Sequence, residues 1–157
     1  MKQFQQIFRK YPINDNSCVL DIGAGKGRVI IMAALLGGGK ATGLEIDPYI
    51  CQVGLHNIEQ IEKRYPKLVG RCRLENIDAL DYEIGGDINY FFFFDPFDYL
   101  SFKKMLSKII ESNCQKPREI TLFLPETEEM RSVVLTKLAT FLGLKSKEPL
   151  PCADLMK

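Results

Sequence analysis

The chain has 157 residues, which fits one domain with a hydrophobic core of its own. Apolar residues make up 46%, charged residues make up 26%, and the formal net charge is +1. These values are typical of a globular protein and exclude a global positive field that would draw the chain onto nucleic acid. Its apolar runs are shorter than the roughly 20 residues of a membrane span, and its first ten residues lack the apolar block of a signal peptide. We therefore expect a single cytoplasmic domain over residues 1–157.

The sequence contains few of the residues that a metal site or a nucleophilic triad requires. His56 is the one histidine, and the five cysteines form no Cys-x-x-Cys pair. A zinc site or a nucleophile–histidine pair is therefore not expected, and the cysteines are predicted to be free thiols.

Predicted strands and helices alternate along the chain. Apolar, β-prone runs predict strands at Ser17–Ile22, Lys40–Ile46, Cys72–Glu75, Asp87–Phe94, Glu119–Leu124 and Leu144–Leu150. Helices are predicted between them at Arg28–Leu36, Pro48–Tyr65, Tyr99–Asn113 and Glu126–Leu142. Asp47 and Asp98 are the predicted N-caps of the second and third helices. This order predicts an α/β three-layer sandwich with a mostly parallel central sheet, and it leaves open whether the C-terminal strands are shortened.

The first strand ends in D-I-G-A-G-K-G-R, with glycines at every second position. Such glycines allow a sharp turn and a close approach of the backbone to a ligand. The G-x-G-x-G spacing differs from the G-x-G-x-x-G fingerprint of dinucleotide binding, and it suits a nucleoside that carries an amino acid. The alternative is a glycine turn that only packs a helix on a strand. The candidate cofactor-binding residues here are Asp21, Ile22, Gly23, Ala24, Gly25 and Gly27.

Acidic residues also follow the next two strands, at the sheet edge where parallel α/β proteins bind ligands. Glu45, followed by Ile46, is predicted to accept both hydroxyls of a ribose; the alternative makes it a surface residue. Asp78 is predicted to accept an adenine amino group while the Ala79 N–H serves a ring nitrogen. The alternative for Asp78 is a plain Asx turn.

The fourth strand ends in F-F-D-P-F-D. Asp95 is expected at the rim of the pocket, where it is the candidate catalytic residue, whereas Asp98 is expected only to cap the next helix. The alternative is that both acids simply end a strand and begin a helix.

Together the four motifs resemble those of the class I, seven-β-strand methyltransferases, which use S-adenosyl-L-methionine. The resemblance covers residues 16–124 and is closest to small bacterial methyltransferases of undefined substrate and to lysine methyltransferases of the ATP synthase c-subunit type. It implies that Asp21 orients the glycine turn and the methionine amino group, and that Gly23 and Gly25 make room for the ligand. It also implies that Asp95 lies beside the transferred methyl group.

Two departures from the family pattern affect the acceptor. Asp95-Pro96-Phe97 replaces the D-P-P-Y or N-P-P-Y of members that methylate bases and amines, so a protein or a small molecule is expected as acceptor, rather than nucleic acid. The ends of the chain are short, so a substrate lid is absent, comes from a partner subunit, or is formed by Phe4–Tyr11. A cofactor-binding module without turnover is therefore the alternative function, and a nicotinamide-dependent oxidoreductase is disfavoured by the glycine spacing.

Overall fold

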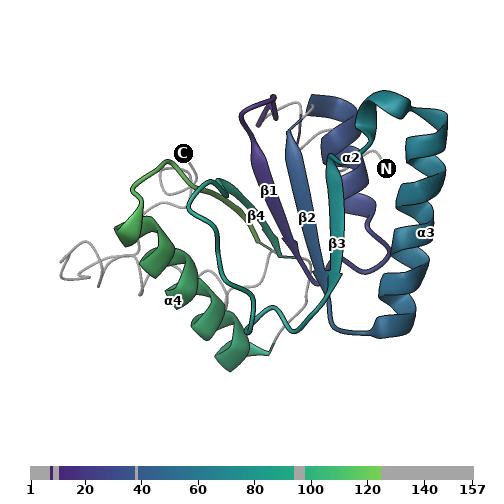
Figure 1. Cartoon of the computed structure of the whole chain (residues 1–157). Coiled ribbons are helices and arrows are strands. Elements are labelled where there is room, and N and C mark those ends of the chain that lie inside the picture. Colours follow the sequence, from purple (N-terminus) through teal and green to yellow (C-terminus); the bar gives the residue numbers. More distant parts are fainter. Residues whose placement is uncertain (1–7, 9–10, 38, 94–97, 125–157) are drawn as a thin grey trace, which may run out of the picture.

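One parallel sheet forms the centre of the protein (Figure 1). The computed structural model describes residues 8, 11–37, 39–93 and 98–124. Its strands are β1 (Cys18–Ile22), β2 (Lys40–Glu45), β3 (Cys72–Asn76), β4 (Tyr90–Phe93) and β5 (Thr121–Phe123). They are ordered β3-β2-β1-β4-β5, and all four neighbouring pairs are parallel. The order therefore reverses between β1 and β4, and the predicted helix Glu126–Leu142 and strand Leu144–Leu150 lie outside the described residues.

Helices cover both faces of this sheet. They are α2 (Arg28–Gly37), α3 (Pro48–Arg64) and α4 (Tyr99–Gln115), with a short 3-10 helix, η1 (Pro66–Leu68), after α3. Figure 1 shows α2 and α3 on one side of the sheet and α4 on the other. The predicted three-layer α/β sandwich is confirmed. Among the described residues, no helix is long and apolar enough to cross a membrane.

Two aspartates begin the longer helices, as predicted. Asp47 accepts the backbone N–H groups of Tyr49 and Ile50 through Oδ1 at 2.8 and 3.0 Å, and Pro48 occupies the first turn. Asp98 accepts the N–H of Ser101 at 2.9 Å. Each cap supplies an acceptor to N–H groups that have no partner within the helix.

The fourth strand is shorter than predicted. Its sequence predicts a start at Asp87, but β4 begins at Tyr90. A turn precedes it, in which Ile88 donates its N–H to Gly85 at 3.2 Å. Arg118 then donates from Nε to the carbonyl of Ile88 at 2.6 Å. A side chain from a distant segment thus takes a carbonyl that a longer strand would use. The predicted end at Phe94 lies outside the described residues.

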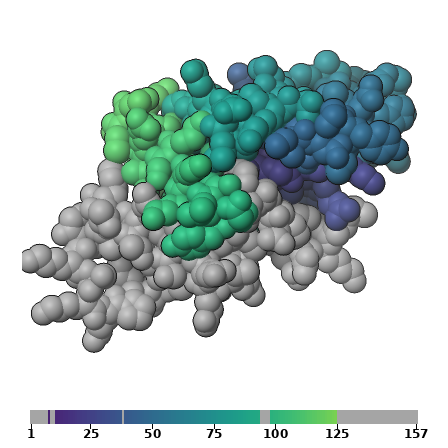
Figure 2. Space-filling view, turned by 90° about the horizontal axis from the view of Figure 1, so that it is seen from below, coloured from purple at the N-terminus to yellow at the C-terminus, as the bar shows by residue number. Residues whose placement is uncertain are grey.

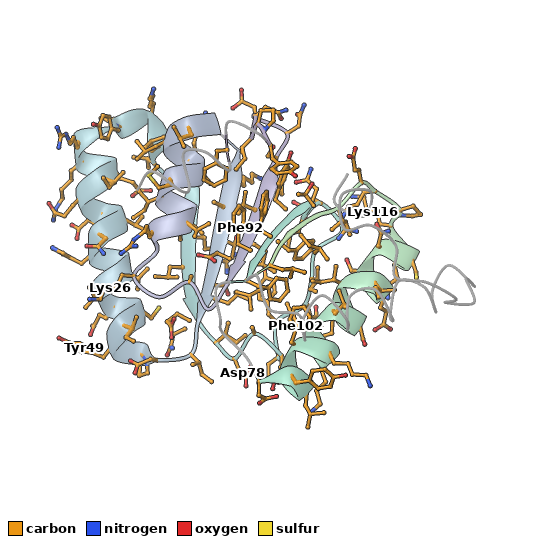
Figure 3. All side chains as sticks on the ribbon, turned by 180° about the vertical axis from the view of Figure 1, so that it is seen from behind. Lys26, Tyr49, Asp78, Phe92, Phe102 and Lys116 are labelled. Atoms are coloured by element: carbon orange, nitrogen blue, oxygen red, sulfur yellow. The ribbon has the colours of Figure 1, made fainter. Side chains whose placement is uncertain are left out.

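Phenylalanines of β4 divide between the two faces. Phe92 lies on the α2 and α3 face, with its ring 5.5 Å from that of Phe8. Phe91 and Phe93 belong to the core under α4, where Phe93 meets Phe102 at 5.2 Å. Figure 3 labels Phe92 on the sheet and Phe102, the partner of Phe93, on α4. Burial on both faces explains the unbroken apolar run that predicted a central strand.

Candidate functional site

Residues 23–27, here called the glycine loop, connect β1 to α2. Gly23, Gly25 and Gly27 have φ values of 75°, 56° and 78°, a conformation that side chains other than glycine rarely adopt. Gly23 and Ala24 both donate N–H groups to the carbonyl of Leu44, at 3.0 and 2.9 Å, so the loop crosses the end of β2. A Cβ atom built on Gly25 would meet nothing within 4 Å. The loop is therefore sharply turned and leaves open space at its centre, as a close approach to a ligand requires.

Glu45, the last residue of β2, fixes this loop. It is 8% exposed, so the alternative of a surface residue is wrong. Its Oε2 accepts the N–H of Gly25 at 2.8 Å, and its Oε1 accepts the N–H of Asp47 at 2.9 Å. One carboxylate thus joins the glycine loop to the start of α3. Each of its oxygens has a further lone pair with which to accept a ligand hydroxyl.

Asp21 is a fully buried carboxyl group without a partner. It lies in β1 between Gly43 of β2 and Phe92 of β4, and it is 1% exposed. Neither of its side-chain oxygens makes a hydrogen bond with any residue in the described part of the chain. Burial, followed by repulsion from Glu45, raises its pKa from 3.8 to about 7. Buried polar groups are normally satisfied, so a partnerless one is expected where a ligand or water completes the site.

Two asparagines that the sequence did not single out hold the backbones around Glu45. Asn76, at the end of β3, donates from Nδ2 to the carbonyls of Glu45 and Ile46 at 2.9 and 3.0 Å. Asn57 of α3 donates from Nδ2 to the carbonyl of Lys26 at 3.1 Å. These three bonds span 30 or 31 residues, and a lone asparagine carries no signal in the sequence for so distant a partner.

The segment after β3 forms a turn. Asp78 accepts the N–H of Leu80 through Oδ1 at 2.9 Å, which is an Asx turn, and Ala79 is buried. Ile77 donates its N–H to the carbonyl of Glu45 at 3.2 Å, which connects this segment to the end of β2. Figure 3 places Asp78 at the lower edge, where the strands end. The Asx turn is therefore present, and its second carboxylate oxygen remains for the predicted contact with adenine.

Two large side chains at this edge stay exposed. Ile46 is 68% exposed and Tyr49 is 75% exposed, although both follow a buried strand end. In the view from below, the teal residues that follow β3 lie between the blue of α3 and the green of α4 (Figure 2). The edge therefore presents apolar surface beside its carboxyl groups.

Several sequence predictions concern residues outside the described part. Asp95 lies there, together with residues 94, 96 and 97 of the fourth motif, so its predicted place at the pocket rim stays a prediction. The predicted lid Phe4–Tyr11 is described only at Phe8 and Tyr11. Cys18, Cys51, Cys72 and Cys114 are free thiols, as predicted. The described residues contain no group of three or more metal-ligating side chains.

Comparison with known proteins identifies the fold. No protein-family model matches the sequence. A segment of 42 residues, 27% of this chain, is 50% identical to ribosomal protein L11 methyltransferase of Syntrophotalea carbinolica and spans 14% of that protein. The chain therefore corresponds to a small part of this relative.

Solved structures match over more of the chain. An RNA methyltransferase from Salinibacter ruber, in complex with S-adenosyl-L-homocysteine, has a TM-score of 0.60 at 17% identity. That match covers 71% of this chain and 67% of the other. Geranyl diphosphate C-methyltransferase from Streptomyces coelicolor A3(2), also with S-adenosyl-L-homocysteine, has a TM-score of 0.58 at 14% identity, over 69% of this chain and 39% of that enzyme. The chain has the class I, Rossmann-like fold of S-adenosylmethionine-dependent methyltransferases, as its motifs predicted.

Proposed function

We propose that this chain binds S-adenosyl-L-methionine at the carboxyl ends of β1, β2 and β3 and transfers its methyl group to an acceptor. The observation that carries the proposal is the pair of buried carboxyl groups, Asp21 and Glu45, beside the open glycine loop. This ligand offers a ribose diol and two cationic groups, the ammonium and the sulfonium. The carboxyl group of Asp21 fits a cationic group of the ligand, and the spare lone pairs of Glu45 fit the ribose diol.

Each residue of the site then has a role in binding. Glu45 accepts the ribose hydroxyls, and Asp21 serves as the buried counter-ion of the methionine ammonium. The open space at Gly25 admits the ligand to the loop. Asp78 and the Ala79 N–H contact the adenine, and the exposed Ile46 offers apolar surface to the adenine ring. The positive end of α2 faces the same edge and favours the ligand carboxylate.

The cofactor supplies an electrophilic methyl group for displacement in line with its sulfur. The protein has to hold the acceptor in that line and to exclude water. We assign this task to Asp95, which accepts a hydrogen bond from an incoming amine and aligns it. Asp95→Ala removes the acceptor and is expected to abolish turnover and to leave the affinity for S-adenosylmethionine unchanged. Unchanged turnover in this variant would remove the catalytic role.

A protein lysine or another amine is the acceptor we favour, because of the likeness to c-subunit-type lysine methyltransferases. The similar proteins bear names that refer to a ribosomal protein, an RNA and geranyl diphosphate. Their diversity supports methyl transfer in general and leaves protein, RNA and small molecules to be compared. The test is methyl transfer from labelled cofactor to each of these three pools.

Calorimetric titration with S-adenosylmethionine, S-adenosylhomocysteine and NAD tests the first step. We expect micromolar binding of both adenosyl ligands and none of NAD. Glu45→Ala should lose that binding, whereas Glu59→Ala, on the exposed surface of α3, should keep it. Binding of NAD alone would overturn the proposal and favour a nicotinamide-dependent enzyme. Binding of S-adenosylmethionine without methyl transfer to any pool would identify a cofactor-binding module.

A further inference from the structure

The outer side of the glycine loop rests on helix α3. Gly54 and Asn57 are three residues apart on this helix, so they lie on one helix face. A Cβ atom on Gly54 would lie 3.1 Å from the carbonyl carbon of Lys26 and 3.2 Å from the carbonyl oxygen of Gly25. Gly54 thus allows the backbone of the loop to pack directly on the helix.

Two side chains then hold successive residues of the loop. Glu45, from β2, accepts the N–H of Gly25 at 2.8 Å. Asn57, from α3, donates to the carbonyl of Lys26 at 3.1 Å. The peptide unit between Gly25 and Lys26 therefore lies between two peptide units that are held by hydrogen bonds. The preceding unit is bonded to β2, and the following unit is bonded to α3. Glu45 belongs to the predicted cofactor site, whereas Asn57 bonds to the loop from the side of α3.

We infer that Asn57 is a positioning residue for the cofactor: its bond to Lys26 holds the glycine loop in the conformation that binds S-adenosylmethionine. The inference rests on the proposed function. Glycine-rich segments lose more conformational freedom on ordering than other segments do. A loop that is ordered before binding avoids that loss when the ligand arrives, which increases affinity. Loss of the bond should therefore weaken binding by loosening the loop, although every residue proposed to touch the ligand is still present.

The donor group of Asn57 is the feature to test, because a carbonyl oxygen accepts hydrogen bonds and only the Nδ2 end of the amide side chain donates them. Asn57→Asp keeps the size and shape of the side chain, removes the donor and places a negative oxygen against the carbonyl of Lys26. Asn57→Ala removes the bond and adds no charge. Gln60→Glu is the matched control, because it converts an exposed amide of the same helix into an acid.

Affinity and loop order are measured separately. Calorimetric titration gives the affinity of each variant for S-adenosylmethionine and S-adenosylhomocysteine, and hydrogen exchange of the Gly25 and Gly27 amides reports loop order in the protein without ligand. We expect Asn57→Asp to weaken binding about tenfold and Asn57→Ala roughly fivefold, which is the effect of one hydrogen bond. Exchange of the two amides should become faster in both variants. Gln60→Glu should change neither measurement.

A merely structural bond predicts a different pattern. It would lower the thermal midpoint of both Asn57 variants and leave the affinity of the folded protein and the exchange of the loop amides unchanged. That result would overturn the inference and leave the proposed function intact. If the wild-type protein binds neither adenosyl ligand, the proposed function fails, and the inference fails with it.

Discussion

The two faces of the central sheet bury different kinds of side chain. Under α4 the core is built of apolar side chains, among them Leu20, Ile22 and Phe93 from the strands, and the buried hydroxyl of Ser112 is satisfied by a backbone carbonyl. The face under α2 and α3 has an apolar core as well, but its strands also bury the carboxyl groups of Asp21 and Glu45. An apolar face contributes mainly to stability, whereas a buried carboxyl group costs free energy unless it is satisfied. Both faces therefore stabilise the fold, and the α2 and α3 face also buries carboxyl groups, whose cost the proposed ligand would offset.

A substitution in the α4 face should change stability and leave binding unchanged. Leu106→Ala creates a cavity at a residue that is 1% exposed, and it should lower the free energy of unfolding by about 3 kcal/mol. Leu100→Ala makes the same chemical change on the same helix at a residue that is 67% exposed. It should cost less than about 0.5 kcal/mol. Urea unfolding measures both values, and calorimetry should find that folded Leu106→Ala keeps its affinity for S-adenosylmethionine. A large loss of affinity would contradict the division of roles between the faces.

Asp21→Asn should act in opposite directions on stability and binding. The folded pKa of Asp21, about 7, is above its ordinary value of 3.8, so the folded protein holds a proton that the unfolded chain releases between these pH values. Stability from this group is therefore present below about pH 4 and is lost as the pH rises to about 7. One pK unit corresponds to about 1.4 kcal/mol, which gives a loss of roughly 4 kcal/mol at pH 8. An asparagine has no such proton to lose.

Urea unfolding at pH 4 and pH 8, without ligand, checks this difference. The two proteins should have similar stability at pH 4, and Asp21→Asn should be the more stable one at pH 8. The same variant should bind S-adenosylmethionine more weakly, because the ligand loses its buried counter-ion. Equal stability at pH 8 would show that Asp21 finds a partner in the free protein.

Local sequence signals were sufficient for the fold. Asp47 before Pro48 predicted a helix start, because an N-cap bonds only to the next few residues of the chain. The apolar run of β4 predicted a strand that is covered on both faces. Alternation of strands and helices then allowed few arrangements other than a parallel sheet. The same argument predicted that the acidic residues at the strand ends lie at one edge of the sheet, because parallel strands all end there.

Long-range hydrogen bonds could not be predicted in the same way. The partners of Asn57 and Asn76 lie 30 or 31 residues away, and only the folded packing of α3 and β3 brings them within reach. For the same reason the start of β4 was placed too early, since Arg118 takes the carbonyl of Ile88 from a distant segment. Positioning contacts of this kind are tertiary, and residue type alone does not reveal them.

Gly43→Ala tests how closely β2 supports the glycine loop. A Cβ atom at Gly43 would lie 2.6 Å from the Cβ of Ala24 and 2.8 Å from Cδ1 of Leu74. Leu74 can rotate, but the Cβ of Ala24 moves only with the loop backbone. We expect a loss of about 1 to 3 kcal/mol in the free energy of unfolding and weaker cofactor binding. Adding Ala24→Gly removes the clash and should restore binding in calorimetry; a double variant no better than Gly43→Ala would contradict this explanation.

The smallest expected effect concerns Asn76, which ties β3 to the carbonyls of Glu45 and Ile46. Asn76→Asp replaces the shared donor with a carboxylate that faces two carbonyl oxygens. The free energy of unfolding should fall by about 1 kcal/mol. The affinity for S-adenosylmethionine should become several-fold weaker, because displacement of this backbone also moves the side chain of Glu45. Asn16→Asp, on the exposed segment before β1, is the matched control for the added charge. If Asn76→Asp lowered stability and left affinity unchanged, the sheet alone would fix the position of Glu45 at the end of β2. Asn76 would then contribute to stability only, as Leu106 does on the α4 face.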